Sequence, residues 1–281
     1  MDFPDLHRIK PNSRVRLNSI DPDGSPGFRP AAKAKGNKNA IKDQAAAEVT
    51  ANVEQIAKLQ ELLYAENKTG LLVVLQGMDT SGKDGVVRGV FSGVNPQGCH
   101  VISFKKPSET EADRDFLWRI HAAIPARGEI SVFNRAHYED VLIVRVHNFV
   151  PETIWRKRYD MINQFEHYLT DNHVVMLKFM LHISKDEQKA RLQARLDDPT
   201  KRWKFNQGDV QERKHWDDYQ RAYEAVLDKC STPAAPWYVI PANKKWYRNW
   251  AISTIVRQTL EEISPKAPKA TFDPKAIVIP D

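Results

Sequence analysis

The stretch LLVVLQGMDTSGKDGVVRGV, residues 71–90, decides the fold of this chain. It begins with an apolar run typical of a buried strand, and Gly77-x-x-x-x-Gly82-Lys83 then precedes a helical pattern. Glycines at these positions let backbone N–H groups surround phosphate oxygens, the helix contributes the positive end of its dipole, and the lysine adds a mobile charge. We predict a phosphate-binding loop over residues 77–84, with a glycine-rich turn that binds no ligand as the alternative.

Two carboxylates distinguish this loop from the usual phosphate-binding sequence. Asp84 occupies the position where Ser or Thr would present a hydroxyl to magnesium, and Asp79 lies inside the loop. Two acids beside phosphates would repel them unless a hard, oxygen-seeking cation lies between. We therefore expect Asp79 and Asp84 to bind Mg²⁺, with Mn²⁺ as a substitute. Alternatively, Asp84 only stabilises the dipole at the start of the helix.

Apolar runs recur along the chain and alternate with segments long enough for helices. This alternation predicts an α/β fold with a parallel five-stranded sheet flanked by helices. We expect strands at 71–76, 100–104, 129–133, 174–183 and 237–241. We expect helices at 84–94, 109–124, 152–170, 185–197, 209–229 and 246–264, after a first helix that ends near Asn67.

The chain divides into three segments by composition. Residues 1–42 are rich in Pro, Gly, Asn and Lys, which indicates an extended arm, with packing starting after it. Residues 43–264 carry the strand and helix patterns and form the phosphate-binding domain. Residues 265–281 indicate a loosely attached C-terminal tail.

Composition and cysteine usage exclude several classes of protein. The 42 Lys and Arg against 36 Asp and Glu give a net charge of +6, which fits either a solvated surface or a polyanionic partner. The apolar runs are shorter than the roughly 20 residues that cross a bilayer, and the N-terminus lacks the apolar core of a secretory signal. Cys99 and Cys230 form no paired motif, and His137 and His147 have no third ligand in register, so we read these histidines as structural. We expect a cytoplasmic protein with no membrane partner.

Polar residues follow the third strand, in EISVFNRAHYEDV at 129–141. At the carboxyl end of a parallel strand, side chains face the ligand crevice, so Asn134 and Arg135 are candidate site residues. The guanidinium of Arg135 suits a forked contact to phosphate, and its alternative is a surface salt bridge. Glu139 and Asp140 either position the arginine or a metal-bound water, or cap the next helix.

A basic segment follows the fourth strand. Arg191 and Arg195 share one helix face at a spacing of four, and further basic residues follow in TKRWKF at 200–205, where Lys201 and Lys204 are candidate ligands for phosphate. We expect residues 191–208 to form a lid that closes over phosphates and supplies charge in the transition state. A solvated charged hairpin is the alternative.

Two further expectations concern residues beside this lid and beside the second strand. We expect Trp203 to anchor the lid in the core rather than to stack on a base. Lys105 and Lys106 leave the end of the second strand toward the side where nucleotide kinases bind the acceptor, or else only solubilise the surface.

Together these motifs resemble the polyphosphate kinase 2 family from about residue 40 to residue 264. The matching blocks, in order, are GMDTSGKDG, FKKPSETE, DFLWRIH, FNRAHYEDVL, KFMLHISKDEQKARLQARLDDPTKRWKF and ERKHWDDYQRAYE. The resemblance implies a P-loop kinase fold, thymidylate-kinase-like and with a lid, and transfer of phosphoryl groups from inorganic polyphosphate to nucleotides with Mg²⁺. It also implies roles in phosphate and metal binding, at the strand end and in the lid, for Asp79, Lys83, Asp84, Asn134, Arg135, Arg191 and Arg195.

Two positions in FNRAHYEDVL refine this expectation. Asn134 stands where relatives restricted to ADP tend to carry an acid, which favours AMP as well as ADP as acceptor. Ala136 replaces the usual Ser after the arginine, so one family hydroxyl is missing here.

We therefore expect a kinase that moves the terminal phosphoryl group of polyphosphate to AMP or ADP, with ATP as a product and other nucleotides as further acceptors. The acceptor phosphate oxygen, with a second pKa of about 6, is largely deprotonated at neutral pH, so no strong base is needed. Asp79 is also a candidate for orienting the acceptor. We expect a homo-oligomer. One alternative is an ATP-dependent nucleotide kinase of the same fold. The other is a non-catalytic polyanion- or RNA-binding module, for which Trp203 and Trp216, interleaved among basic residues, are the supporting feature. We expect no nucleic-acid partner.

Overall fold

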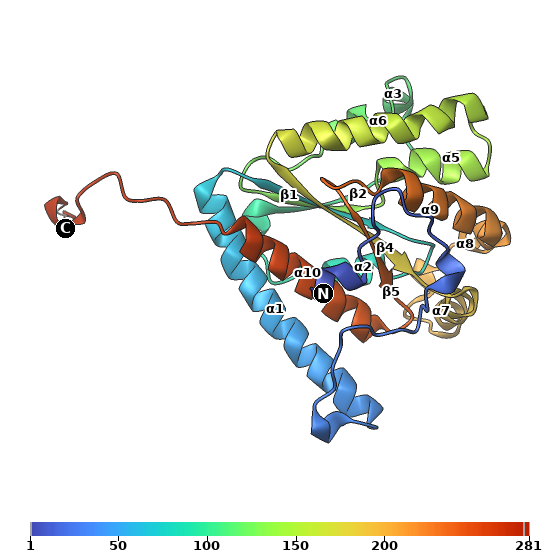
Figure 1. Cartoon of the computed structure of the whole chain (residues 1–281), viewed down its shortest axis with the longest axis horizontal. Helices are drawn as coiled ribbons and strands as arrows, with labels where there is room; N and C mark the ends of the chain where they lie inside the picture. Colours follow the sequence, from blue (N-terminus) through green and yellow to red (C-terminus); the bar gives the residue numbers. More distant parts are fainter. Residues whose placement is uncertain (1, 278, 281) are drawn as a thin grey trace.

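The computed structural model describes residues 2–277 and 279–280, and its centre is a parallel sheet of five strands (Figure 1). The strands are β1 (Gly70–Gln76), β2 (Cys99–Ser103), β3 (Ile130–Asn134), β4 (Val174–His182) and β5 (Trp237–Pro241). Their order is β2-β3-β1-β4-β5, and every neighbouring pair is parallel. All five predicted strands are confirmed, with their ends shifted by at most one residue. Since β1 lies in the middle, the loop that follows it emerges between β3 and β4.

Helices cover both faces of the sheet (Figure 1). One face carries α1 (Lys38–Glu66), α2 (Lys83–Val90) and α10 (Lys245–Ile263), and the other carries α5 (Ile143–Val146), α6 (Glu152–Asp171) and α9 (Trp216–Cys230). Helices α7 (Lys185–Asp197) and α8 (Gln207–Glu212) follow the carboxyl end of β4, while α3 (Glu109–Ala112) and α4 (Trp118–His121) lie in the connection from β2 to β3. None of the helices in the described residues combines the length and apolarity needed to cross a membrane.

Two predicted helices are broken in the structure. The helix expected at 109–124 is two short helices, because Asp115 Oδ1 accepts a hydrogen bond from the N–H of Leu117 at 3.0 Å and forms a turn between them. The helix expected at 209–229 is divided into α8 and α9 by a 3-10 turn at Arg213–His215. In that turn, Arg213 donates to the backbone oxygen of Lys185 at 2.6 Å, which ties it to α7.

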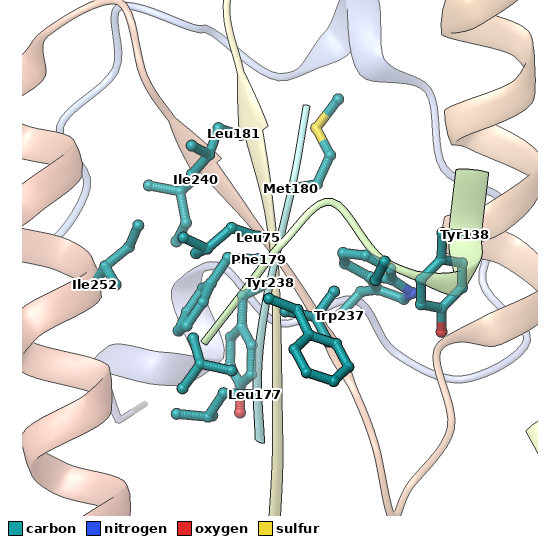
Figure 2. Close-up of a cluster of buried hydrophobic side chains, with 14 of the residues drawn as sticks. Leu75, Tyr138, Leu177, Phe179, Met180, Leu181, Trp237, Tyr238, Ile240 and Ile252 are labelled. Atoms are coloured by element: carbon teal, nitrogen blue, oxygen red, sulfur yellow. The ribbon is translucent and has the colours of Figure 1, made fainter. Parts of the chain in front are cut away.

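The core consists of apolar side chains on both faces of the sheet. Leu71–Leu75 of β1 are fully buried, as expected for a central parallel strand. Successive residues of β4 and β5 alternate between the faces, as Figure 2 shows for Phe179 and Tyr238 toward the side of Ile252 on α10, and for Trp237 toward Tyr138. The rings of Trp237 and Tyr138 pack edge to face, with their centroids 4.8 Å apart.

Residues 2–37 of the N-terminal arm form no helix longer than a 3-10 turn, but the arm packs against the domain, contrary to the expectation that packing starts after residue 42. Leu17 is only 1% exposed, and Arg8 forms an antiparallel bridge with Tyr238. The N–H of Ile9 donates to the backbone oxygen of Trp237 at 2.8 Å. Strand β5 lies at the edge of the sheet, where its backbone groups need partners, and the arm supplies some of them. Composition alone did not reveal this, because the arm has no regular period.

A buried ion pair lies beneath the turn that follows β3. Lys178 of β4 and Glu166 of α6 are at most 1% exposed, and the ammonium lies 2.5 Å from the carboxylate. Lys178 also donates to the hydroxyl of Tyr138 at 2.9 Å, and His137 lies 3.1 Å from Glu166. Burial alone would raise the pKa of Glu166, but Lys178 and His137 outweigh it and lower the pKa. His137 is therefore a structural residue in this cluster.

We predict that Lys178→Met lowers the free energy of unfolding by about 3 kcal/mol, because it leaves the Glu166 carboxylate buried without its partner. Urea denaturation followed by circular dichroism measures this loss. Lys189→Met, at an exposed position of α7, serves as the control. Equal midpoints for the two variants would contradict the structural role of the pair.

Candidate active site

The loop between β1 and α2 has a backbone that only glycine allows at two points. Gly77 has a φ of +146° and Gly82 a φ of +105°. A Cβ atom on Gly77 would lie 2.7 Å from the backbone oxygen of Leu181, and one on Gly82 would lie 1.8 Å from Arg248 Nη1. The glycines therefore allow β4 and α10 to approach the loop closely.

Lys83, the first residue of α2, points back over the loop. Its ammonium donates to the backbone oxygen of Gly77 at 2.6 Å, and the side chain is buried. Burial and, to a smaller extent, the positive charge of Arg135 lower the pKa of Lys83 to about 8, against the opposite effect of Asp79, Glu139 and Asp84. Without an anion the ammonium lies in an unfavourable position, which a bound phosphate would relieve.

The carboxyl end of β3 holds both acidic residues of the loop. Asn134 Nδ2 donates to Asp84 Oδ1 at 2.6 Å, and Arg135 Nη2 donates to Asp79 Oδ1 at 2.6 Å. Arg135 has a φ of +64°, a left-handed conformation that is costly for a residue with a side chain and is typical of functional sites. The sequence predicted these four residues separately, and the structure brings them together in two pairs.

The two carboxylates are suited to a shared divalent cation. Each uses Oδ1 for its protein hydrogen bond, and Oδ2 of Asp79 and of Asp84 accepts none from the described residues. Within that part of the chain, no group of three or more His, Cys, Asp or Glu side chains could hold a metal alone. Mg²⁺ commonly binds through one or two carboxylates, substrate phosphates and water, so this donor set fits it.

The two arginines that we expect in a lid, Arg191 and Arg195, contact protein groups in this structure. Arg191 donates to the backbone oxygens of Thr80 and Ser81 in the loop, at 2.8 and 3.0 Å, and to those of Ala242 and Asn243 after β5. It thereby fixes the loop between α7 and α10. Arg195 donates to the backbone oxygen of Lys204 and to Asp209, which holds the turn after α7 against α8.

These residues surround one cavity of about 620 Å³. Its lining carries three acidic residues, Asp79, Asp84 and Asp209, and ten basic ones: Lys83, Arg88, Lys105, Arg135, Arg191, Arg195, Lys201, Lys204, Lys245 and Arg248. Such an excess of cations in one cavity is suited to a polyanion.

Three cations of this lining were missed at the sequence level: Arg88, Lys245 and Arg248. Arg248 is 3% exposed, and burial together with nearby Arg191 lowers its pKa to about 10. Burial and the charges of Arg191 and Arg248 likewise lower the pKa of Lys245. The position of these residues of α10 in the sequence, far from the loop, does not predict that they line the cavity, because only the fold brings α10 to the loop.

Some predicted residues lie outside the cavity lining. Gly77 shapes the loop from below, and Lys106 is exposed beside Lys105 without lining the cavity. Glu139 also lies outside it; burial raises its pKa, against the opposing charges of Arg135 and Lys83. The expectation for Trp203 is wrong, because this side chain is 78% exposed and anchors nothing in the core.

Comparisons with known proteins agree with this geometry. The family model described as Polyphosphate kinase 2 (PPK2) matches residues 39–268. The chain belongs to the polyphosphate kinase 2 family.

Relatives of this family match over 78% to 98% of the chain. An AMP/ADP-polyphosphate phosphotransferase from Meiothermus ruber is 52% identical over 274 residues, which cover 97% of this chain and 98% of that protein. An ADP-polyphosphate phosphotransferase from Rhodopseudomonas palustris is 47% identical, covering 78% of this chain and 80% of the relative. The crystal structure of Polyphosphate Kinase 2 from Arthrobacter aurescens TC1 superposes with a TM-score of 0.91 at 42% identity, covering 98% and 95% of the two chains.

The lowered pKa of Lys83 predicts how anion binding by this polyphosphate kinase 2 family member depends on pH. Below pH 8 the Lys83 ammonium is already protonated, so it adds no pH dependence to anion binding. Above pH 8 the amine is neutral in the free protein and must take up a proton when the anion binds. The affinity therefore falls by up to about tenfold per pH unit. Titration with inorganic tripolyphosphate in EDTA between pH 6 and pH 10 measures it. Lys83→Met should bind more weakly and show a shallower fall just above pH 8, with the remaining fall toward pH 10 due to Arg248 and Lys245. The same slope in both proteins would assign the titration to another group.

Proposed function

We propose that this protein transfers the terminal phosphoryl group of inorganic polyphosphate to AMP and ADP, with Mg²⁺. The observation that carries the proposal is the cavity whose ten basic side chains surround a phosphate-binding loop with two carboxylates. The membership in the polyphosphate kinase 2 family supports the donor, and the name of the Meiothermus ruber relative supports both acceptors.

The residues of the cavity supply alignment and charge neutralisation. Backbone N–H groups of the loop and Lys83 hold the phosphoryl group that is transferred, and Arg135 stabilises its equatorial oxygens as charge shifts between donor and acceptor. Asp79 and Asp84 would hold Mg²⁺, which neutralises phosphate charge when bound. The acceptor is a phosphate oxygen that is already largely deprotonated, so the site requires no strong general base.

The chain of a polyphosphate needs cations beyond the loop itself. Arg191, Arg248 and Lys245 extend the positive lining past Lys83 toward α10. This extension favours a long polyanion over ATP as donor, because ATP as donor would need a second base site besides that of the acceptor. Asn134, which bonds Asp84 where ADP-restricted relatives tend to carry an acid, supports AMP as well as ADP as acceptor.

The lid belongs to the same proposal. Residues 191–208 span the end of α7 and the turn before α8, and they bring Arg195, Lys201 and Lys204 to the cavity. Closure of this segment over bound phosphates would exclude water and add positive charge.

Localisation and assembly also belong to the proposal. The two cysteines are free, which suits a cytoplasmic protein. The exposed stripe Ile154, Met161 and Tyr168 on α6, at a spacing of seven residues, supports a homo-oligomer.

The test of this function is the formation of ADP and ATP from AMP, long-chain polyphosphate and Mg²⁺, with no ATP added. We expect both products, and none after Mg²⁺ is removed with EDTA. Turnover that requires ATP as donor would show a conventional nucleotide kinase. Binding of polyphosphate without any turnover would show a polyanion-binding module.

We predict that Lys83→Ala and Asp84→Asn each lower kcat by at least about a hundredfold while the fold is retained, because each removes charge stabilisation at the transferred group. Steady-state assays measure kcat, and circular dichroism checks folding. Lys106→Ala, which alters an exposed lysine outside the cavity lining, is the matched control. Rates within twofold of the original protein for the first two variants would contradict their assigned roles.

A further inference from the structure

The segment that joins β5 to α10 is held by the N-terminal arm. Asn243, the second residue after β5, donates from its backbone N–H to the oxygen of Pro22 at 3.2 Å. Its side-chain Nδ2 donates to Asp23 Oδ2 at 3.0 Å. The next residue, Lys244, donates from its ammonium to the backbone oxygen of Asp23 at 2.6 Å. The arm therefore binds both residues that precede α10, and Figure 1 shows it in blue beside the start of that helix.

Further contacts hold residues 22–28 of the arm, which we call the strap, against α10. The hydroxyl of Tyr247 donates to the backbone oxygen of Pro26 at 2.7 Å. The rings of Phe28 and Trp250 pack edge to face, with their centroids 5.0 Å apart. The strap is therefore a packed part of the domain, although its composition is that of an extended segment.

Asn243 also connects the strap to the phosphate-binding loop. Its backbone oxygen accepts a hydrogen bond from Arg191 Nη2 at 2.9 Å. The other terminal nitrogen of Arg191, Nη1, donates to the backbone oxygens of Thr80 and Ser81 in the loop. Thr80 has a φ of +65°, a conformation that is costly for its backbone and that persists only where the surroundings hold it. A single guanidinium therefore lies between Asn243 and the strained part of the loop.

The side chain of Asn243 fixes the helix that carries this arginine. Asn243 Oδ1 accepts a hydrogen bond from the N–H of Ser184 at 3.0 Å. Ser184 is the N-cap of α7, and its hydroxyl accepts from the N–H of Glu187 at 3.1 Å. Glu187 in turn accepts from Arg191 Nε at 2.6 Å. Asn243 thus holds Arg191 both at its guanidinium and through the first turn of its helix.

We propose that Asp23 and Asn243 are positioning residues for phosphoryl transfer, which hold Arg191, and through it the loop, in the geometry that aligns the transferred group. This inference rests on the proposed function, because it assigns residues outside the cavity to that reaction. Neither residue lines the cavity, so they act through Arg191 and not by contact with substrate.

The proposal predicts an effect on kcat rather than on KM. Small displacements of groups that align the reacting atoms lower the rate strongly. Binding of the substrates depends on the ten cations of the cavity lining, which remain when the strap is disturbed.

The experiment exchanges the two members of the contact between Asp23 and Asn243. Asn243→Asp alone places two carboxylates against each other where the structure has a hydrogen bond of 3.0 Å, so the strap is repelled. We expect kcat with AMP and polyphosphate to fall by at least about fivefold, with both KM values within twofold. Addition of Asp23→Asn to Asn243→Asp restores a donor and an acceptor with their roles reversed, and should return kcat to within twofold of the original protein.

The matched control combines Asp5→Asn with Asn243→Asp. It has the same composition and net charge as the exchanged pair, but Asp5 pairs with Arg8, at 3.4 Å, in another part of the arm. The control should keep the low kcat of Asn243→Asp. Hydrogen–deuterium exchange of residues 77–84 without substrates gives a readout that is independent of turnover. It should be faster in Asn243→Asp and in the control, and normal in the exchanged pair.

Four results would overturn the inference. They are an unchanged kcat in Asn243→Asp, a kcat that the exchanged pair does not restore, an equal recovery in the control, and faster exchange spread equally over the whole sheet instead of the loop. The last result would show a general loss of stability. Activity of the unaltered protein with AMP and polyphosphate tests the proposed function separately, and loop exchange is measured without turnover, so the two failures are distinguishable.

Discussion

Repulsion among the basic residues around the loop is the constraint on which the rest of the site depends. Ten Lys and Arg side chains line one cavity against three carboxylates. Burial is the main cause of the lowered pKa values of Lys83, Lys245 and Arg248, and a neighbouring positive charge lowers each of them as well. An anion with many charges would relieve the repulsion. Binding of such a ligand therefore offsets the unfavourable free energy of holding these cations close together.

The fold opposes this repulsion by holding the loop from several sides. Arg135 and Asn134 bind its two carboxylates from β3, and Arg191 binds its backbone oxygens from α7. Beneath the β3 turn, the buried Lys178 and Glu166 pair anchors Tyr138, three residues after Arg135. These contacts keep the loop in shape without a ligand, so binding does not have to order it first.

Local patterns predicted those parts of the site that lie close together in sequence. The strand before the loop, the glycines and Lys83 form one continuous signal, and Asn134 and Arg135 follow from their place at the end of a strand. Arg248 and Lys245 carry no such signal, because α10 reaches the loop only through the packing of the whole domain. The prediction for Trp203 was wrong because large aromatic side chains are buried on average, and only the structure shows that this one is exposed. The packing of the N-terminal arm likewise depends on the edge strand β5, which lies far away in sequence.

The most direct test of the account is a crystal structure of this protein with polyphosphate and Mg²⁺ bound. We expect a terminal phosphoryl group between the loop backbone and the Lys83 ammonium, with the cation touching Asp79 and Asp84 and the chain running toward Arg191 and Arg248. A polymer bound on another surface, with the turn between β1 and α2 vacant or closed to it, would contradict the account.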